Sequence, residues 1–247
     1  MSMENPHAPK PLIGVTPAFY HHEELDRSII AVNYTDRIQE AGGLPVIIPP
    51  LQNCEQVRVL LDRLDGIVLG GGRDVLPSRY GGKLIPEIIR VQLPQRDRSD
   101  FLLVEAIWER RFPCLGICLG LQELNIFLGG DVFQHIPKEV PEAIIHKIDD
   151  MFEARHDVRV QPESLLARVT GYSSINTNSA HHQSIKTLAN GIHIVAKTED
   201  GIIEAVEPDD NRPFLAVQWH PEMEADPVAG LNLFRWLVNE ANRENRK

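Results

Sequence analysis

Residues 113–120 read Pro-Cys-Leu-Gly-Ile-Cys-Leu-Gly, and residues 121–130 continue as Leu-Gln-Glu-Leu-Asn-Ile-Phe-Leu-Gly-Gly. We predict a buried strand that turns sharply at Cys118 into an apolar helix, which the final glycines end. Cys118 lies between Gly116 and Gly120, which is the thiol version of the G-x-S-x-G elbow that presents a nucleophile on a strained strand-to-helix turn. Glycines on both sides let neighbouring backbone pack closely around such a turn. Because a helix N-terminus favours the thiolate, Cys118 is a candidate nucleophile.

The composition is that of a globular protein. The chain has 247 residues, of which 43% are hydrophobic, enough for a substantial core. It shows no internal repeat and no obvious linker, so we predict one domain over residues 11–247 after a flexible tail at residues 1–10. The formal net charge is −10 without any block of Lys or Arg, which disfavours nucleic acid and anionic membranes as partners. No apolar run could span a bilayer and no signal-peptide core is present, so we expect a cytoplasmic protein.

The three cysteines do not suggest a disulfide framework, because their number is low and odd. In the predicted strand, Cys114 and Cys118 would lie about 13 Å apart, beyond the reach of a disulfide. Their spacing also does not suit a zinc knuckle. We expect Cys54 and Cys114 to be buried structural thiols.

Continuous apolar runs alternate with helical segments before residue 130, which indicates a parallel α/β sheet covered by helices. Functional groups in such sheets gather beyond the carboxyl ends of the strands, where residues 70–72 (Gly-Gly-Gly) and Cys118 both lie. Later in the chain, Asp200-Gly201 is a hairpin signal between further strands, and a final helix is predicted at 228–242. The predicted early strands are 12–16, 44–48, 67–69 and 114–117, and the predicted early helices are 25–41, 55–64 and 97–111.

A second informative segment is residues 214–222, Phe-Leu-Ala-Val-Gln-Trp-His-Pro-Glu. Here an apolar strand ends at His220, and Glu222 follows two residues later, on the same side in extended geometry. A carboxylate in that place can accept a hydrogen bond from the imidazole. His220 and Glu222 would then be the base and the orienting acid of a triad. Alone, the pattern equally fits an ordinary strand end with a solvated charge. Together with the cysteine elbow, it favours a triad.

Residues 116–122 and 218–222 together resemble the signature of class I glutamine amidotransferases. Within that superfamily the chain is most similar to the γ-glutamyl-γ-aminobutyrate hydrolase family. The resemblance implies a single-domain three-layer αβα sandwich of flavodoxin-like type, with a mostly parallel central sheet and a small antiparallel extension. Further matching segments are Ala-Gly-Gly-Leu-Pro at 41–45, Gly-Gly-Arg-Asp-Val-Leu-Pro at 71–77, Leu-Gln-Glu-Leu-Asn at 121–125, His-His-Gln at 181–183 and Asp-Gly-Ile-Ile-Glu-Ala at 200–205.

The resemblance also implies roles for single residues. Cys118 would be the nucleophile, His220 the general base and acid, and Glu222 the residue that orients His220. The backbone N–H groups of Leu119 and Gly71 would form the oxyanion hole, which fits a donor after the nucleophile and a second donor on a neighbouring glycine loop. The alternative for that glycine loop is a tight turn, and a phosphate loop fits less well because neither phosphate-binding motif is present.

Three polar residues are candidates for substrate binding. Gln122 lies one helical turn after Cys118 and can face the same pocket, although helix packing would explain it too. His181 and Gln183 would line the pocket by the resemblance, and a structural hydrogen-bonding loop is the alternative. Adjacent histidines in a strand point in opposite directions, so His181 and His182 are not expected to share a metal ion. We predict neither a metal nor an organic cofactor.

The function that this pattern favours is a cysteine hydrolase that cleaves γ-glutamyl amide bonds through a γ-glutamyl thioester and releases glutamate. The partner would be a small-molecule γ-glutamyl substrate, and a homodimer is one option for the assembly. One alternative is a glutaminase subunit that delivers ammonia to a separate synthetase, and Leu119 fits it because the hydrolase family often has Arg there. A non-catalytic binding protein on the same scaffold is the other alternative.

Overall fold

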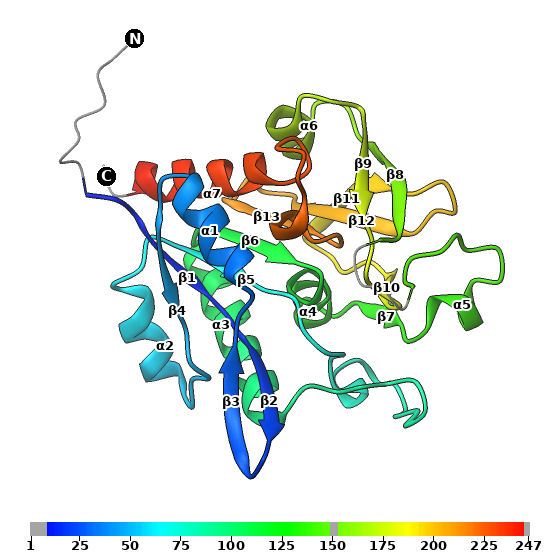
Figure 1. The fold of residues 1–247 in the computed structure, drawn as a ribbon, viewed down its shortest axis with the longest axis horizontal. Helices are drawn as coiled ribbons and strands as arrows, with labels where there is room; N and C mark the ends of the chain where they lie inside the picture. The colour runs from blue at the N-terminus through cyan, green and yellow to red at the C-terminus, as the bar shows by residue number, and fades with distance from the viewer. Residues whose placement is uncertain (1–8, 149–152, 245–247) are drawn as a thin grey trace.

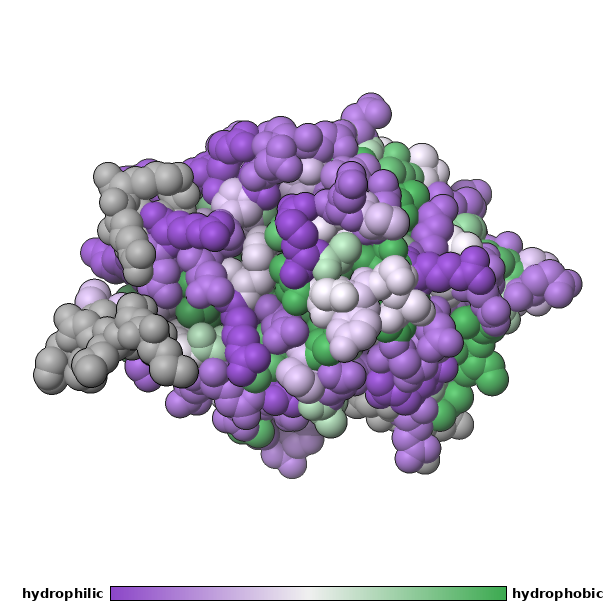
Figure 2. Space-filling view, turned by 90° about the horizontal axis from the view of Figure 1, so that it is seen from above, coloured by the Kyte–Doolittle hydropathy of each residue, from purple (hydrophilic) through white to green (hydrophobic). Residues whose placement is uncertain are grey.

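The computed structural model describes residues 9–148 and 153–244, so most of the predicted tail at residues 1–10 lies outside the described residues. Among the helices of these two ranges, none combines the length and the apolar character needed to cross a membrane. Hydrophilic side chains predominate on the face shown in Figure 2, where hydrophobic residues form scattered patches.

Within the described residues, the central sheet has nine strands (Figure 1). Five of them are parallel and carry the predicted glycine loop, the cysteine elbow and the His–Glu segment at their carboxyl ends. In spatial order these strands are β4 (Leu44–Ile47), β1 (Leu12–Val15), β5 (Gly66–Leu69), β6 (Cys114–Ile117) and β13 (Phe214–Val217).

The sheet continues beyond β13 as an antiparallel half. The parallel part of the predicted fold is confirmed, and the antiparallel extension is larger than the small one that was expected. Its strands, again in spatial order, are β12 (Ile203–Pro208), β11 (Ile192–Lys197), β8 (Arg155–Val160) and β9 (Ser174–Asn178).

Helices cover both faces of the sheet, which confirms the three-layer αβα sandwich (Figure 1). Consecutive residues of a strand point to opposite faces, and in β5 the side chain of Val68 packs in one core while those of Ile67 and Leu69 pack in the other. One face is covered by α1 (Val32–Glu40), α6 (Leu165–Thr170) and α7 (Leu231–Glu244), and the other by α2 (Cys54–Leu61), α3 (Pro94–Arg110) and α4 (Leu119–Phe127).

The predicted helix at 25–41 is wrong in its first part. That part forms a hairpin with β2 (Ala18–His22) and β3 (Leu25–Ile29), and the helix α1 begins only at Val32. The two turn residues, Glu23 and Glu24, have φ values of 48° and 63°, as two-residue hairpin turns require. Apolar residues four apart in this segment resemble a helical stripe, but β3 is exposed along its length and buries no such stripe.

Shorter elements complete the fold, and a two-stranded sheet of β7 and β10 lies beside the main sheet. The remaining elements are η1 (Pro77–Tyr80), β7 (Asp131–Phe133), α5 (Ile136–Glu139), β10 (Ser184–Thr187) and η2 (Pro221–Met223).

The expectation of two buried structural thiols holds for Cys114, whereas Cys54 is exposed at the start of α2.

Candidate active site

The cysteine elbow has the geometry that its sequence predicts. Cys118 follows β6 and is the N-cap residue of α4, with φ 51° and ψ −95°, a strained conformation for a residue with a Cβ. Its N–H donates to the Val217 carbonyl at 2.8 Å, which ties the elbow to the neighbouring strand. A Cβ on Gly120 would lie 2.6 Å from the Leu69 carbonyl oxygen, so this flanking position needs glycine. The strained turn and the close packing therefore hold the thiol above the carboxyl edge of the sheet.

Leu119 is the first residue of α4. The N–H groups of the first helical turn have no partner inside the helix. The position of the Leu119 N–H, directly after the thiol, therefore suits an oxyanion donor. Its side chain is buried, and a Cβ on Gly72 would lie 2.7 Å from Leu119 Cδ2. The glycine loop after β5 thus packs directly on the elbow.

His220 and Glu222 are brought together as a pair. Nδ1 of His220 lies 2.7 Å from Oε1 of Glu222. The segment is not extended as expected, because Pro221 and Glu222 form the 3₁₀ turn η2, but the two side chains still meet. The backbone of His220 is held on both sides by Asn178, whose amide donates to the His220 carbonyl at 2.8 Å and whose Oδ1 accepts the His220 N–H at 3.0 Å.

The electrostatics of His220 favour the imidazolium. Burial lowers the pKa of His220, but the negative charge of Glu222 and the contact with Cys118, both by charge and by hydrogen bond, raise that pKa well above its usual value. A histidine that is protonated next to a thiol can hold the sulfur as a thiolate and later give its proton to a leaving group. The geometry can therefore support nucleophilic catalysis by Cys118.

The predicted oxyanion donor Gly71 lies at the site, but its N–H already has an acceptor. It donates to the Tyr34 hydroxyl at 3.0 Å. Burial and the nearby Glu222 raise the pKa of Tyr34 well above its usual value, so the hydroxyl keeps its proton. A Cβ on Gly71 would lie 2.7 Å from Cε1 of His220. Gly71 is thus required by close packing, and its role as an oxyanion donor stays a prediction that needs Tyr34 to give up this bond.

Gln218 is a polar neighbour of the nucleophile that the sequence analysis missed. Its Nε2 donates to the Cys118 sulfur at 3.4 Å, and its Oε1 accepts a bond from Gln122 Nε2 at 3.1 Å. Gln122 also donates to the Gln183 carbonyl at 3.3 Å. The signal was present in the sequence, because Gln218 precedes His220 by two residues at the end of a strand. In this arrangement Gln122 positions Gln218, and its predicted contact with substrate stays a prediction.

His181 and Gln183 are both buried. Nδ1 of His181 lies 3.0 Å from the Gln183 carbonyl oxygen, and Gln183 Nε2 donates to the Gln134 carbonyl at 3.2 Å. His182 points elsewhere, with Nε2 2.9 Å from Asp74 Oδ1. The two histidines therefore face different partners, although they lie in the loop before β10 and not in a strand as expected.

A cavity of about 740 Å³ lies beside these histidines. It is lined by residues 87, 88 and 90, by segments 135–137, 140–141 and 143–148, and by His181 and His182. Cys118 and His220 are not among its lining residues. The cavity therefore does not lie directly over the predicted nucleophile.

Comparison with solved structures defines the class of the fold. The chain superposes on the crystal structure of a Thermoplasma acidophilum protein, provisionally named as part of a GMP synthase, with a TM-score of 0.66 and 19% identity, covering 97% of this chain and 98% of the other. This likeness shows a shared α/β fold. Residues 11–222 match the peptidase C26 family, which is class I glutamine amidotransferase-like, and the chain belongs to that family.

Relatives within this group carry two kinds of name. A protein of Rickettsia prowazekii, provisionally named as glutamine amidotransferase-like, is 30% identical over 276 residues, covering 93% of this chain and 97% of the relative. A protein of Mycobacterium tuberculosis, provisionally named as a glutamine amidotransferase, is 33% identical over 95% of this chain and 76% of its own length. The γ-glutamyl-γ-aminobutyrate hydrolase of Escherichia coli K12 is 32% identical over 89% of this chain and 88% of the enzyme.

Proposed function

We propose that the protein is a cysteine hydrolase that cleaves γ-glutamyl amide bonds and releases glutamate. The observation that carries the proposal is the placement of Cys118 on a strained elbow, in contact with a partly buried His220 that is paired with Glu222 at 2.7 Å. The likeness to a γ-glutamyl-γ-aminobutyrate hydrolase supports the γ-glutamyl group as the acyl part of the substrate.

In the proposed mechanism, the Cys118 thiolate attacks the γ-carbonyl carbon, and the carbonyl oxygen becomes an oxyanion stabilised by the Leu119 N–H and by the glycine loop at Gly71. His220 gives its proton to the leaving amine as the C–N bond breaks, which leaves a γ-glutamyl thioester on Cys118. Neutral His220 then takes a proton from water, the hydroxide attacks the thioester, and glutamate leaves while the thiol is restored. Glu222 keeps the imidazole oriented through both steps.

Replacement of the nucleophile tests this proposal. Cys118→Ala should abolish glutamate release from a panel of γ-glutamyl amides, because no other thiol lies on the elbow. Cys54→Ala is the matched control, since Cys54 is exposed at the start of α2, and this variant should retain wild-type rates. Glutamate release by Cys118→Ala at the wild-type rate would rule the mechanism out.

A second candidate is a glutaminase that supplies ammonia to a separate synthetase. The relatives named as glutamine amidotransferases and Leu119 after the nucleophile favour it. The same panel, with glutamine included, separates the two functions. Cleavage of γ-glutamyl-amines by the purified protein alone supports the hydrolase, whereas glutamine cleavage that appears only with an added partner supports the glutaminase.

A further inference from the structure

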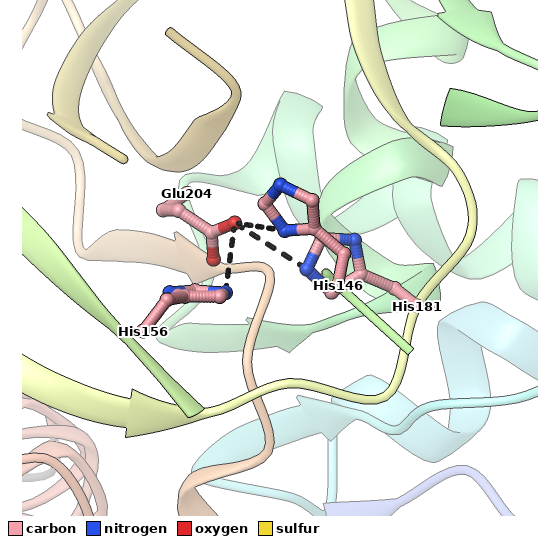
Figure 3. A group of neighbouring side chains, drawn as sticks. All are labelled: His146, His156, His181 and Glu204. Atoms are coloured by element: carbon pink, nitrogen blue, oxygen red, sulfur yellow. Dashed lines mark ion pairs between the residues drawn. The ribbon is translucent and has the colours of Figure 1, made fainter. Parts of the chain in front are cut away.

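Three histidines and a glutamate form a buried cluster next to the candidate active site (Figure 3). They are His146, His156, His181 and Glu204, and each is at most 5% exposed. One ligand atom from each lies within 4.8 Å of the others. As Figure 3 shows, the three imidazoles converge on one carboxylate oxygen of Glu204. The Oε1 atom lies 3.3 Å from His181 Nε2 and 3.7 Å from both His146 Nδ1 and His156 Nε2.

Hydrogen bonds on the outer side of two imidazoles determine their tautomers. His146 Nε2 lies 2.9 Å from the Asp200 carboxylate, and His181 Nδ1 lies 3.0 Å from the Gln183 carbonyl. Because carboxylates and carbonyls only accept hydrogen bonds, those outer nitrogens carry the protons. The inner nitrogens of His146 and His181 therefore present lone pairs to Glu204. Imidazoles held in this way by a carboxylate or a carbonyl are typical of metal ligands.

The inner atoms are left without conventional partners. Among the described residues, His146 Nδ1, His181 Nε2, both nitrogens of His156 and both oxygens of Glu204 have no hydrogen-bond partner. Lone pairs then face a carboxylate oxygen in an interior that solvates them poorly. One shared proton could satisfy only one of these contacts, whereas a cation at the centre satisfies all of them.

We propose that His146, His156, His181 and Glu204 form a structural binding site for a divalent transition-metal ion, with Zn²⁺ as the best-fitting ion. Zn²⁺ prefers imidazole nitrogen and carboxylate oxygen at about 2.0–2.2 Å in tetrahedral geometry, which places ligand atoms ~3.3 Å apart. The nitrogen–oxygen distances of 3.3–3.7 Å meet this spacing closely. The more widely spaced ligand atoms, up to 4.8 Å apart, would move about 1.5 Å closer together around the bound ion. Four protein ligands in a buried position leave no open coordination place, as in structural zinc sites.

The site would connect distant parts of the chain. His146 belongs to the segment that lines the cavity of about 740 Å³, and His156, His181 and Glu204 come from β8, the loop before β10 and β12. The Glu204 carbonyl accepts the Gln218 N–H at 2.7 Å, and Gln218 holds the Cys118 sulfur. The ion would thus join the cavity wall to the strand edge that carries the nucleophile.

The experiment uses the full chain without a histidine tag and measures metal binding directly. Stripped protein is titrated with Co²⁺ and Zn²⁺, and bound metal is counted by plasma mass spectrometry. We expect one equivalent per chain and the visible absorption of four-coordinate Co²⁺. Cys118→Ala should bind equally, because the triad thiol is not a ligand. Glu204→Gln and His156→Ala should weaken binding at least about 10–100-fold, whereas His193→Ala, on the neighbouring strand β11 but paired with Asp209, should not.

The proposal does not depend on the proposed hydrolase function. It is overturned if the wild type binds no stoichiometric metal, or if Cys118→Ala loses the metal while Glu204→Gln keeps it, because the ion would then belong to the triad. If the ligand variants do not fold, the wild type alone decides the question. Zn²⁺ should raise the melting temperature of stripped wild-type protein, since a ligand that binds only the native state stabilises it, and an unchanged melting temperature rejects the site.

Discussion

At the scale of single residues, the charge of His220 depends on its carboxylate partner. Burial alone would depress the pKa of His220, and Glu222 and Cys118 reverse that effect. The Tyr34 hydroxyl belongs to the same centre. It accepts a hydrogen bond from the Gly71 N–H, and its own pKa is raised by burial and by Glu222. The pKa values of His220 and Tyr34 are therefore both set by their neighbours in the reactive centre.

Glu222→Gln tests this dependence. The amide keeps the size of the side chain but removes the negative charge, so the pKa of His220 should fall towards or below its usual value. Histidine NMR in wild type and variant measures this change. The rate of glutamate release should drop by roughly 10²–10⁴-fold, as when a triad loses its orienting carboxylate. An unchanged imidazole titration in the variant would show that Glu222 does not control His220.

At the scale of elements, three strand ends build the site. Strands β5, β6 and β13 are adjacent and parallel, and each is followed by one part of the site. Two glycines let these segments approach one another closely, and each makes room for a different kind of neighbour. Gly120 meets backbone, whereas Gly71 meets the ring of His220.

Two glycine-to-alanine variants should separate these effects. In Gly120→Ala the new Cβ meets the Leu69 carbonyl at 2.6 Å, which cannot move aside easily, so stability should fall by about 1–3 kcal/mol. In Gly71→Ala the Cβ displaces the His220 ring, so activity should fall by about 10²-fold with little loss of stability. Urea unfolding and glutamate-release assays on both variants measure the two effects, and equal stability losses would contradict the distinction.

At the scale of the whole molecule, buried polar groups connect a helix layer to the edge of the central sheet. Arg96 of α3 forms an ion pair with Asp100 and donates to the Pro17 carbonyl, to Thr16 Oγ1 at 3.2 Å and to the Gly70 carbonyl at 3.3 Å. These contacts attach α3 to the carboxyl ends of β1 and β5. The start of this helix is thus fastened to the edge of the sheet that carries the site.

Arg96→Leu should lower the free energy of unfolding by about 3–5 kcal/mol, because a buried carboxylate loses its partner. Arg98→Leu is the matched control on the same helix, since Arg98 is exposed, and it should change stability little. Urea denaturation measures both variants. A loss for Arg96→Leu no larger than that for the control would show that the buried pair does not hold the layers together.

Features that depend on local pattern could be predicted from the amino-acid sequence. Strand and helix periodicity predicted the parallel sheet and its helices, and the spacing of glycines around Cys118 predicted the elbow. The same reasoning misjudged the segment at 25–29, because apolar residues four apart fit a helix and an exposed hairpin equally well.

Which distant side chains meet became clear only from the folded chain. The contact of Gln218 with the Cys118 sulfur and the engagement of the Gly71 N–H by Tyr34 join residues from different strands and helices. The His–Glu cluster joins positions 146, 156, 181 and 204, which share no sequence spacing. The physical reason is that periodicity fixes the direction of a side chain relative to its own element, whereas the order of strands in the sheet decides which elements become neighbours.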